Sequence, residues 1–349
     1  MAVVFHPGLK APAHPRVSVC IANFEGEALL PACIDSVQAQ ATDAAIEILV
    51  HDDCSRDRSV MLLRERYPQV HVIASDENVG FCIGNNRMVA RARGDYVLLL
   101  NNDAALSPDA IDRLLEAAEL MGRPAILTLP QLDWDTGILV DRGCLLDPFF
   151  NPIPNLDPVR DDVAYVIGAC LWCPRETWRA LGGFPEWMES IGEDLYLCGL
   201  ARSRGLAVRA LRGSGYRHRQ GATFGGNRAD DGAGLRTSIK RRRLSERNKT
   251  RALIILTPTW LVWPLLALHL AALLVEGIAL SALRRNATLL REVYLPAIAT
   301  PFREWNMLRA CRNEAQATRT ISVVRWFSAV RWQLRKVWML ARYGVPTVR

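Results

Sequence analysis

A short apolar run, Tyr96–Leu100, constrains the fold of this chain more than any other stretch. It contains three leucines in succession and ends abruptly in Asn101-Asn102-Asp103. A continuous apolar run of this length predicts a strand that is buried on both faces, as in a parallel sheet covered by helices. Ser107 and Pro108 follow where they would open a helix, with the serine as its N-cap.

Strand and helix patterns alternate around this run. Strands are expected at 17–22, 46–50 and 70–74, and helical patterns at 28–40, up to 67, and from 81 to about 93. This alternation predicts the α/β class with a mostly parallel sheet and right-handed crossovers. Further expectations are an irregular leader at 1–15, a loop-rich insert at 130–162, a strand at 165–171, a short helix at 174–181 and a helix from Gly192 to about Arg204.

Acidic side chains follow two of the predicted strands. Asp52 and Asp53 end the second strand, and Asp103 ends the strand at 96–100. In an open α/β sheet, ligands bind at the carboxyl ends of the strands. There Asp103 could hold a hard cation and, through it, a diphosphate, while Asp52 or Asp53 could accept the imide N–H of uracil or thymine. The alternatives are that 101–103 is only a turn and that one of the paired aspartates caps the next helix.

Glu193 and Asp194 form a second acidic pair, at the start of a predicted helix. Acids in a first helical turn are favoured by the helix dipole, which is a purely structural explanation. The functional interpretation is that one of them is a general base that takes the proton of a sugar hydroxyl.

Nine cysteines are scattered along the chain, and the N-terminus lacks the apolar region of a secretory signal, so reduced thiols in a cytosolic domain are expected. Cys170 and Cys173 form a lone CxxC. Because zinc sites of this type use two such pairs, we interpret them as core cysteines.

Charge divides the chain into two parts. Residues 1–201 hold 15 Lys+Arg against 29 Asp+Glu, and residues 202–349 hold 28 against 7. The first part is typical of an acidic soluble domain, and the second of a segment that meets an anionic surface.

The basic part also contains a long apolar segment. Residues 252–275 carry no charged side chain over 24 positions, enough to span a bilayer, and basic residues flank them on both sides. This favours a segment that dips into the membrane from the cytoplasmic face or lies in the interface, with a single span or a buried core helix as alternatives, and it argues against nucleic acid as the partner. A basic stretch with three tryptophans at 319–343 suits lipid headgroups or packing on the catalytic domain.

Several motifs, in order over residues 16–225, resemble family 2 inverting glycosyltransferases of the GT-A fold, most closely the rhamnosyltransferase-like branch. They are VSVCIANFEGEALLPACIDSVQAQ, the stretch 52–57, Asn78-Val79-Gly80-Phe81 with Asn85, GDYVLLLNND, GGFPEWMESIGEDLYLC, and Tyr216-Arg217-His218 with Gly221 and Thr223.

This resemblance implies a nucleotide-diphospho-sugar transferase fold of GT-A type over residues 16–235, Rossmann-like with a mostly parallel sheet, followed by a basic, apolar helical membrane-association region over 236–349. It implies transfer of a sugar, plausibly rhamnose, from a dTDP- or UDP-sugar to a lipid-linked or polysaccharide acceptor, with inversion. The protein would act in cell-surface glycan synthesis, at the cytoplasmic face of the plasma membrane.

The resemblance also implies residue roles. Asp103 would bind Mg²⁺ or Mn²⁺ on the donor diphosphate, with His218 as a further ligand. Asp194 would be the catalytic base, with Glu193 beside it. The donor would be contacted by eight residues: Asn23, Phe24, Glu25, Asp52, Asn78, Gly80, Asn85 and Asn102.

The sequence departs from the family pattern in three places. Asn101-Asn102-Asp103 stands for the metal-binding DxD segment, Pro185 replaces an aspartate, and Tyr196 replaces the last acid of the acceptor block. A single carboxylate still suffices for Mg²⁺, which keeps waters and uses substrate phosphates. A catalytically silent membrane scaffold of the same fold is the alternative function. A nucleotidyltransferase is disfavoured because residues 23–27 offer no glycine-rich, lysine-bearing phosphate loop.

Overall fold

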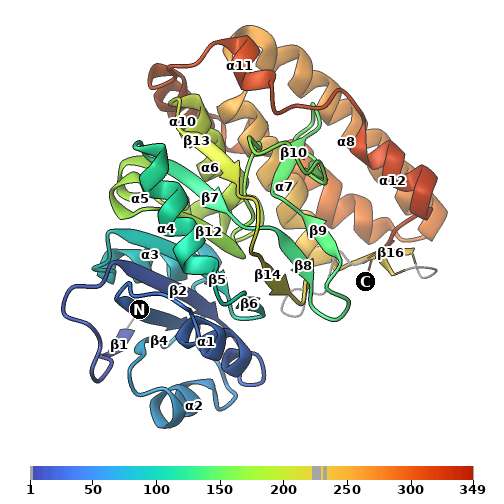
Figure 1. Ribbon diagram of the computed structural model, residues 1–349. Coiled ribbons are helices and arrows are strands. Elements are labelled where there is room, and N and C mark those ends of the chain that lie inside the picture. The colour runs from blue at the N-terminus through green and yellow to red at the C-terminus, as the bar shows by residue number, and fades with distance from the viewer. Residues whose placement is uncertain (1–2, 222–228, 231–233, 349) are drawn as a thin grey trace. The chain divides into compact units, whose positions relative to one another are not determined.

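The structure is a computed structural model that describes residues 3–221, 229–230 and 234–348 (Figure 1). The chain forms two compact units. Unit 1 comprises Met1–Gly143, Pro154–Ser190 and Leu206–Arg219, and unit 2 comprises Cys144–Ile153, Ile191–Gly205 and Gln220–Arg349. Each unit is described by itself below.

Unit 1 is built on a mixed sheet with the strand order β1-β4-β3-β2-β5-β12-β7-β13. Its centre is parallel: β2 (Val17–Asn23), β3 (Ile46–Asp52), β4 (His71–Ser75) and β5 (Tyr96–Asn101). The other strands are β1 (Val3–His6), antiparallel to β4, β12 (Cys170–Pro174), antiparallel to β5 and β7, and the parallel pair β7 (Ala125–Thr128) and β13 (Ala207–Ala210). The predicted α/β class with a mostly parallel sheet is confirmed.

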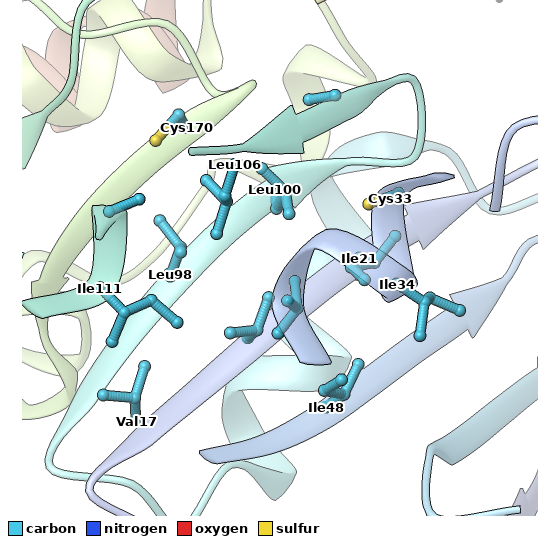
Figure 2. Packing of buried hydrophobic residues seen from close by; sticks show 14 of the residues in the cluster. Val17, Ile21, Cys33, Ile34, Ile48, Leu98, Leu100, Leu106, Ile111 and Cys170 are labelled. Atoms are coloured by element: carbon cyan, nitrogen blue, oxygen red, sulfur yellow. The ribbon is translucent and has the colours of Figure 1, made fainter. Parts of the chain in front are cut away.

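Helices cover this sheet. They are α1 (Leu30–Gln38), α2 (Ser59–Arg66), α3 (Phe81–Arg91), α4 (Ala110–Met121) and α5 (Arg175–Leu181), with a 3-10 turn, η1, at Glu186–Met188. Figure 2 shows side chains of β2, β3, β5, α1 and α4 meeting in the core, among them Ile21, Ile34 and Leu98. Val97–Leu100 are buried, as expected for a strand covered on both faces.

A second, smaller sheet of unit 1 has the order β6-β14-β8-β9. Its strands are β6 (Ala104–Leu106), β14 (Tyr216–His218), β8 (Gln131–Asp133) and β9 (Leu139–Asp141). In its register His218 lies opposite Ala104 on one side and Asp133 on the other. This sheet therefore brings the end of β5 next to a segment more than 110 residues away.

Three local expectations were wrong. The first is the irregular leader, which contributes β1. The region 130–162 is loop-rich as expected and also holds four three-residue strands, β8, β9, β10 (Cys144–Leu146) and β11 (Pro152–Pro154). The strand expected at 165–171 begins only at Cys170, because pairing with β5 sets Leu171 opposite Leu99.

The third concerns the start of α4. This helix begins at Ala110, and the cap is Gln40 rather than Ser107: Gln40 Oε1 accepts from the N–H of Ile111 at 2.9 Å while its Nε2 donates to the Ser107 carbonyl at 2.8 Å. The side-chain amide of Gln40, which is distant in the sequence, therefore caps α4 in place of Ser107.

Cys170 and Cys173 are free, buried thiols on β12, which confirms the prediction that they are core cysteines. Burial raises the pKa of the Cys170 thiol to about 12. Both therefore remain neutral at physiological pH and behave as small core residues.

Unit 2 is helical. Its helices are α6 (Glu193–Ser203), α7 (Ile239–Leu256), α8 (Val262–Arg284), α9 (Leu295–Arg303), α10 (Trp305–Ala317), α11 (Val323–Phe327) and α12 (Arg335–Tyr343), with short turns η2 (Thr259–Leu261) and η3 (Leu289–Tyr294) and small strands β15 (Ala229–Asp230), β16 (Gly234–Thr237) and β17 (Thr347–Val348). A C-terminal helical region is therefore confirmed. By length and composition, Thr259–Arg284 is apolar enough to cross a membrane.

The compact units differ from the domains drawn on the sequence. The sequence assigned residues 16–235 to the catalytic domain, whereas Cys144–Ile153 and Ile191–Gly205 belong with the C-terminal helices. Consequently α6, which carries Glu193 and Asp194, is part of unit 2.

Candidate functional site

A chain of buried side-chain hydrogen bonds crosses the carboxyl ends of β5, β2 and β3. Asn102 Nδ2 donates to Asn23 Oδ1 at 2.8 Å, and Asn23 Nδ2 donates to Asp52 Oδ2 at 2.9 Å. Asn23 and Asp52 end the neighbouring strands β2 and β3, in whose register they lie opposite each other, and Asn102 directly follows β5. The structure thus brings together three of the residues that the sequence proposed as donor contacts.

Gly26 makes this series of side-chain hydrogen bonds sterically possible. A Cβ at this position would stand 2.0 Å from Asn23 Oδ1 and 2.4 Å from Asn102 Nδ2, well inside van der Waals contact. Only a residue without a side chain allows the backbone to approach the amide pair so closely.

Two loops at this edge are joined by backbone-to-side-chain hydrogen bonds. Ser55 Oγ accepts from the N–H of Glu25, and Glu25 Oε1 accepts from the N–H of Arg56, both at 2.9 Å. Asp52 Oδ1 accepts from the N–H of Ser55 at 3.0 Å. Phe24, in the same loop, keeps 39% of its surface exposed. The loop contacts hold Asp52 in place, and the aromatic ring of Phe24, which follows Asn23 in the chain, remains open to solvent.

Asp53 has a different role from its neighbour Asp52. Its carboxylate accepts from the backbone N–H groups of Val79 and Gly80 at 2.7 and 2.9 Å. Burial raises the pKa of Asp53 above its ordinary value. The helix-capping role falls to Asp57, which accepts from the N–H of Ser59 at 3.0 Å. Asp53 therefore anchors the Val79–Gly80 turn, whereas Asp52 remains the candidate ligand contact.

Asp103 and His218, the two predicted metal ligands, are in direct contact. Asp103 Oδ1 lies 3.0 Å from His218 Nε2, and both side chains are buried. Gln131 Oε1 accepts from the Tyr216 hydroxyl at 2.8 Å and lies 3.1 Å from His218 Nδ1. Because an amide oxygen only accepts, Nδ1 carries a hydrogen, and in the neutral form of the ring the lone pair of Nε2 points at the carboxylate.

Two facing acceptors need a proton or a cation between them, so this pair fits a divalent metal. Adjacent ligand atoms of an octahedral cation with bonds of about 2.1 Å lie about 3.0 Å apart, which is the separation of Asp103 Oδ1 and His218 Nε2. Among the described residues no group of three or more His, Cys, Asp or Glu side chains gathers around a common point. A metal held here would therefore take its other ligands from water and from a bound phosphate.

Other predicted donor contacts do not join the hydrogen-bonded chain. Asn78 is exposed, Gly80 binds Asp53 through its N–H, and Asn85 is buried with its amide donating to the Phe81 carbonyl within α3. Thr223, part of the last motif, lies outside the described residues.

Glu193 and Asp194 begin α6 in unit 2, and their environments differ. Glu193 is 5% exposed, and among the described residues no donor reaches its Oε2. Burial and the neighbouring Asp194 raise the pKa of Glu193 from 4.5 to about 8. At neutral pH Glu193 therefore carries a proton, whereas Asp194 differs from it in being only partly buried.

Comparison with known proteins identifies this part of the chain. Residues 18–129 match the model of glycosyl transferase family 2. These residues belong to glycosyl transferase family 2. The match covers β2 to β7, and with them Asn23, Asp52, Asn102 and Asp103.

Curated relatives of this family 2 domain include a Mycobacterium tuberculosis N-acetylglucosaminyl-diphospho-decaprenol L-rhamnosyltransferase, 27% identical over 176 residues, which are 42% of this chain and 57% of the relative. The succinoglycan biosynthesis protein ExoO of Rhizobium meliloti is 31% identical over 109 residues, 31% of each chain. The alignment with the rhamnosyltransferase thus spans a little over half of its length.

Solved structures show that the family 2 domain has the GT-A fold. Staphylococcus aureus TarS 1–349 superposes with a TM-score of 0.52 at 12% identity, covering 87% of this chain and 88% of that one. GalNAc-T7 with UDP, GalNAc and Mn²⁺ gives 0.64 at 13% identity, covering 96% of this chain and 59% of that one.

Two residues around the glycosyltransferase motifs were not found from the sequence. Gln131, which orients His218, lies in the region expected to be a loop-rich insert and reaches the site only through the pairing of β8 with β14. Asn248, on α7, is fully buried and donates to the Ile191 carbonyl at 2.9 Å, next to the acidic pair. No local pattern distinguishes either residue, because both act through tertiary contacts.

Proposed function

We propose that this protein is an inverting glycosyltransferase that moves a sugar, rhamnose in the first instance, from a nucleotide-diphosphate donor to a lipid-linked or polysaccharide acceptor in cell-surface glycan synthesis. The observation that supports the proposal is that unit 1 holds both the Asn102–Asn23–Asp52 series of hydrogen bonds and, at the next residue after Asn102, the Asp103–His218 pair. The first arrangement suits a nucleoside, and the second suits the cation of its diphosphate.

On the donor side, Asp52 accepts the imide N–H of a dTDP- or UDP-sugar while Phe24 offers an apolar face to the base. The amide chain fixes Asp52, and Glu25 fixes the loop that carries Phe24. Asn78, Gly80 and Asn85 would support the donor side indirectly, through the turn held by Asp53.

Asp103 and His218 would hold Mg²⁺ or Mn²⁺. When bound there, it would supply positive charge to the departing nucleoside diphosphate. Gln131 keeps the hydrogen of His218 on Nδ1, so that Nε2 is available as a ligand. The name of the GalNAc-T7 structure, which includes UDP and Mn²⁺, supports this assignment.

Asp194 would take the proton of the acceptor hydroxyl, and attack on the anomeric carbon from the face opposite the leaving diphosphate inverts its configuration. The raised pKa of Glu193 supports this choice of base, because a carboxyl that is protonated at neutral pH cannot accept a proton. Glu193 then acts as a neutral neighbour of Asp194.

A lipid-linked acceptor places the protein at the cytoplasmic face of the plasma membrane. Support comes from the relative named for a diphospho-decaprenol substrate and from the apolar helix α8 with its basic surroundings. Nucleic acid is not expected as a partner.

The test is turnover of a panel of nucleotide sugars by the full chain on acceptor-containing membranes, with product identified by mass spectrometry. Asp103→Ala and Asp194→Asn should each reduce turnover at least a hundredfold, whereas Asp43→Asn, an exposed loop aspartate, should not. Unchanged turnover in both site variants would refute the assignment.

A catalytically silent scaffold is the second candidate, favoured by the single carboxylate at the end of β5. Calorimetry separates the two, because a silent scaffold should show no metal-dependent binding of any nucleotide sugar.

A further inference from the structure

One side of α8 is apolar from Trp263 to Leu283 and faces solvent. The opposite side packs into unit 2 through Val262, Leu266, His269, Leu273, Gly277 and Leu280. Between Trp263 and Leu283 every exposed residue of the helix is apolar: Trp263, Pro264, Ala267, Leu268, Ala271, Ala272, Leu274, Val275, Ile278, Ala279, Ala282 and Leu283. We call this set the α8 face.

The α8 face is too long to be an ordinary surface feature. At 1.5 Å per residue it extends about 30 Å, and only 28% of the most apolar window of the helix is buried. Monomeric soluble proteins rarely expose continuous apolar patches of this size, which mark protein or membrane contacts. The face therefore has an occupant.

We propose that the occupant is an anionic lipid bilayer and that α8 lies in its plane, with the α8 face among the acyl chains near the headgroups, and does not cross the membrane. This rests on the membrane association in the proposed function and specifies its geometry.

The packed side of α8 argues against a span. Glu276 lies on that side and pairs with Arg242 of α7 at 2.5 Å and with Lys336 of α12 at 2.5 Å. Lys336 also pairs with the buried Glu246 of α7 at 2.8 Å. A span would have to leave these partners and carry Glu276 into hydrocarbon, which is unfavourable for a charged side chain. An in-plane helix keeps every one of these contacts.

Helix α12 extends the same surface. Lys336 ties it to α8, while Val337, Trp338 and Leu340 are exposed by 59%, 40% and 49%. The guanidinium carbons of Arg335 and Arg342 lie 4.4 Å and 5.4 Å from the centroid of the Trp338 ring. Apolar residues beside arginines on an exposed helix are typical of an interfacial element. Figure 1 shows α12 beside α8.

Charge selects anionic lipid over a second copy of this chain. The part of the chain that carries α8 and α12 has 28 Lys+Arg against 7 Asp+Glu over residues 202–349. A self-association through such a surface would bring like charges together, whereas an anionic bilayer supplies the complementary sign. The exposed arginines of this part include Arg285, Arg291, Arg303, Arg309, Arg331 and Arg342.

The first test is co-sedimentation of the full chain with vesicles of phosphatidylcholine and phosphatidylglycerol at 7:3. The double variant Leu268→Glu/Val275→Glu should bind at least tenfold more weakly, because it places two carboxylates on the α8 face. Leu120→Glu, on the 88%-exposed Leu120 of α4 in unit 1, should bind as the wild type does. Circular dichroism checks that both variants fold. Unchanged binding of the double variant, or a lipid-free dimer that does not bind vesicles, overturns the proposal.

The second test measures depth. In a Cys54→Ser/Cys311→Ser background, which removes the two half-buried thiols, spin labels are placed at Ala267→Cys, Ala271→Cys and Ala282→Cys. Power saturation should give the same depth at all three sites, within a few ångströms. A span would separate the outermost labels by about 20 Å along the bilayer normal, at 1.5 Å per residue, and this result would overturn the proposal. Neither test uses a sugar donor, so failure of glycosyl transfer and failure of the in-plane geometry are separate outcomes.

Discussion

Replacing Glu193 with glutamine should make the protein more stable at alkaline pH and leave its stability at acidic pH nearly unchanged. Glu193 is buried, and its Oε2 has no donor among the described residues. Glutamine keeps the shape of the protonated carboxyl and cannot ionise. The variant therefore removes one titration from the folded state and little else.

The magnitude follows from the raised pKa. A carboxyl with a pKa near 4.5 in the unfolded chain and about 8 in the folded protein binds more protons when folded, so stability falls as pH rises between the two values. At about 1.4 kcal/mol per pKa unit, the wild type should lose about 3 kcal/mol between pH 6 and pH 9 from this group alone. Below pH 4.5 both forms of the chain are protonated and the group contributes no pH dependence.

Urea unfolding at pH 6 and pH 9, followed by tryptophan fluorescence, measures this loss. Glu193→Gln should show a pH-dependent loss about 3 kcal/mol smaller than the wild type, and Glu65→Gln, an exposed helical glutamate, should behave as the wild type does. Equal losses in wild type and Glu193→Gln would refute the argument from burial. The same variant should retain most turnover at pH 7, because the proposed base is Asp194.

Three further changes test the site and the core. Gly26→Ala should weaken donor binding at least tenfold in calorimetry, because its Cβ would separate the amides of Asn23 and Asn102. Unchanged affinity would show that the Asn102–Asn23–Asp52 hydrogen bonds are not needed for donor binding. Asp53→Asn should lower the free energy of unfolding by about 1–3 kcal/mol, since an amide cannot accept from both backbone N–H groups with two oxygens; a neutral result in urea unfolding would count against this role. Trp172→Ala should cost about 3–5 kcal/mol by opening a cavity in the core, whereas Trp172→Phe should cost clearly less because the indole N–H has no acceptor among the described residues; equal losses in thermal unfolding would contradict the packing argument.

Much of unit 1 follows from short-range pattern. The apolar runs and the helical repeats between them identified β2, β3, β4 and β5 with their helices, because a strand covered on both faces has to be apolar throughout. Errors arose where pairing partners decide the outcome. The start of β12 is set by β5, and the start of α4 is set by the amide of Gln40.

The candidate site shows the same division. The family motifs drew attention to Asp52, Asp103 and His218, and the structure places Asp103 and His218 in contact across 115 positions of sequence. Asp52 and Asp53 cannot be distinguished from the sequence. Only the position of the Val79–Gly80 turn shows that Asp53 is the one that anchors this turn.

The sequence by itself determined the alternation of elements, the carboxyl-edge placement of its acids and the apolar, basic character of the last third, since these depend on residue type and spacing along one segment. Tertiary structure alone decided which acid is buried and protonated, which nitrogen of His218 faces Asp103 and which side of α8 meets solvent. Burial and hydrogen-bond partnership depend on segments distant in the chain, and these set charge state and exposure.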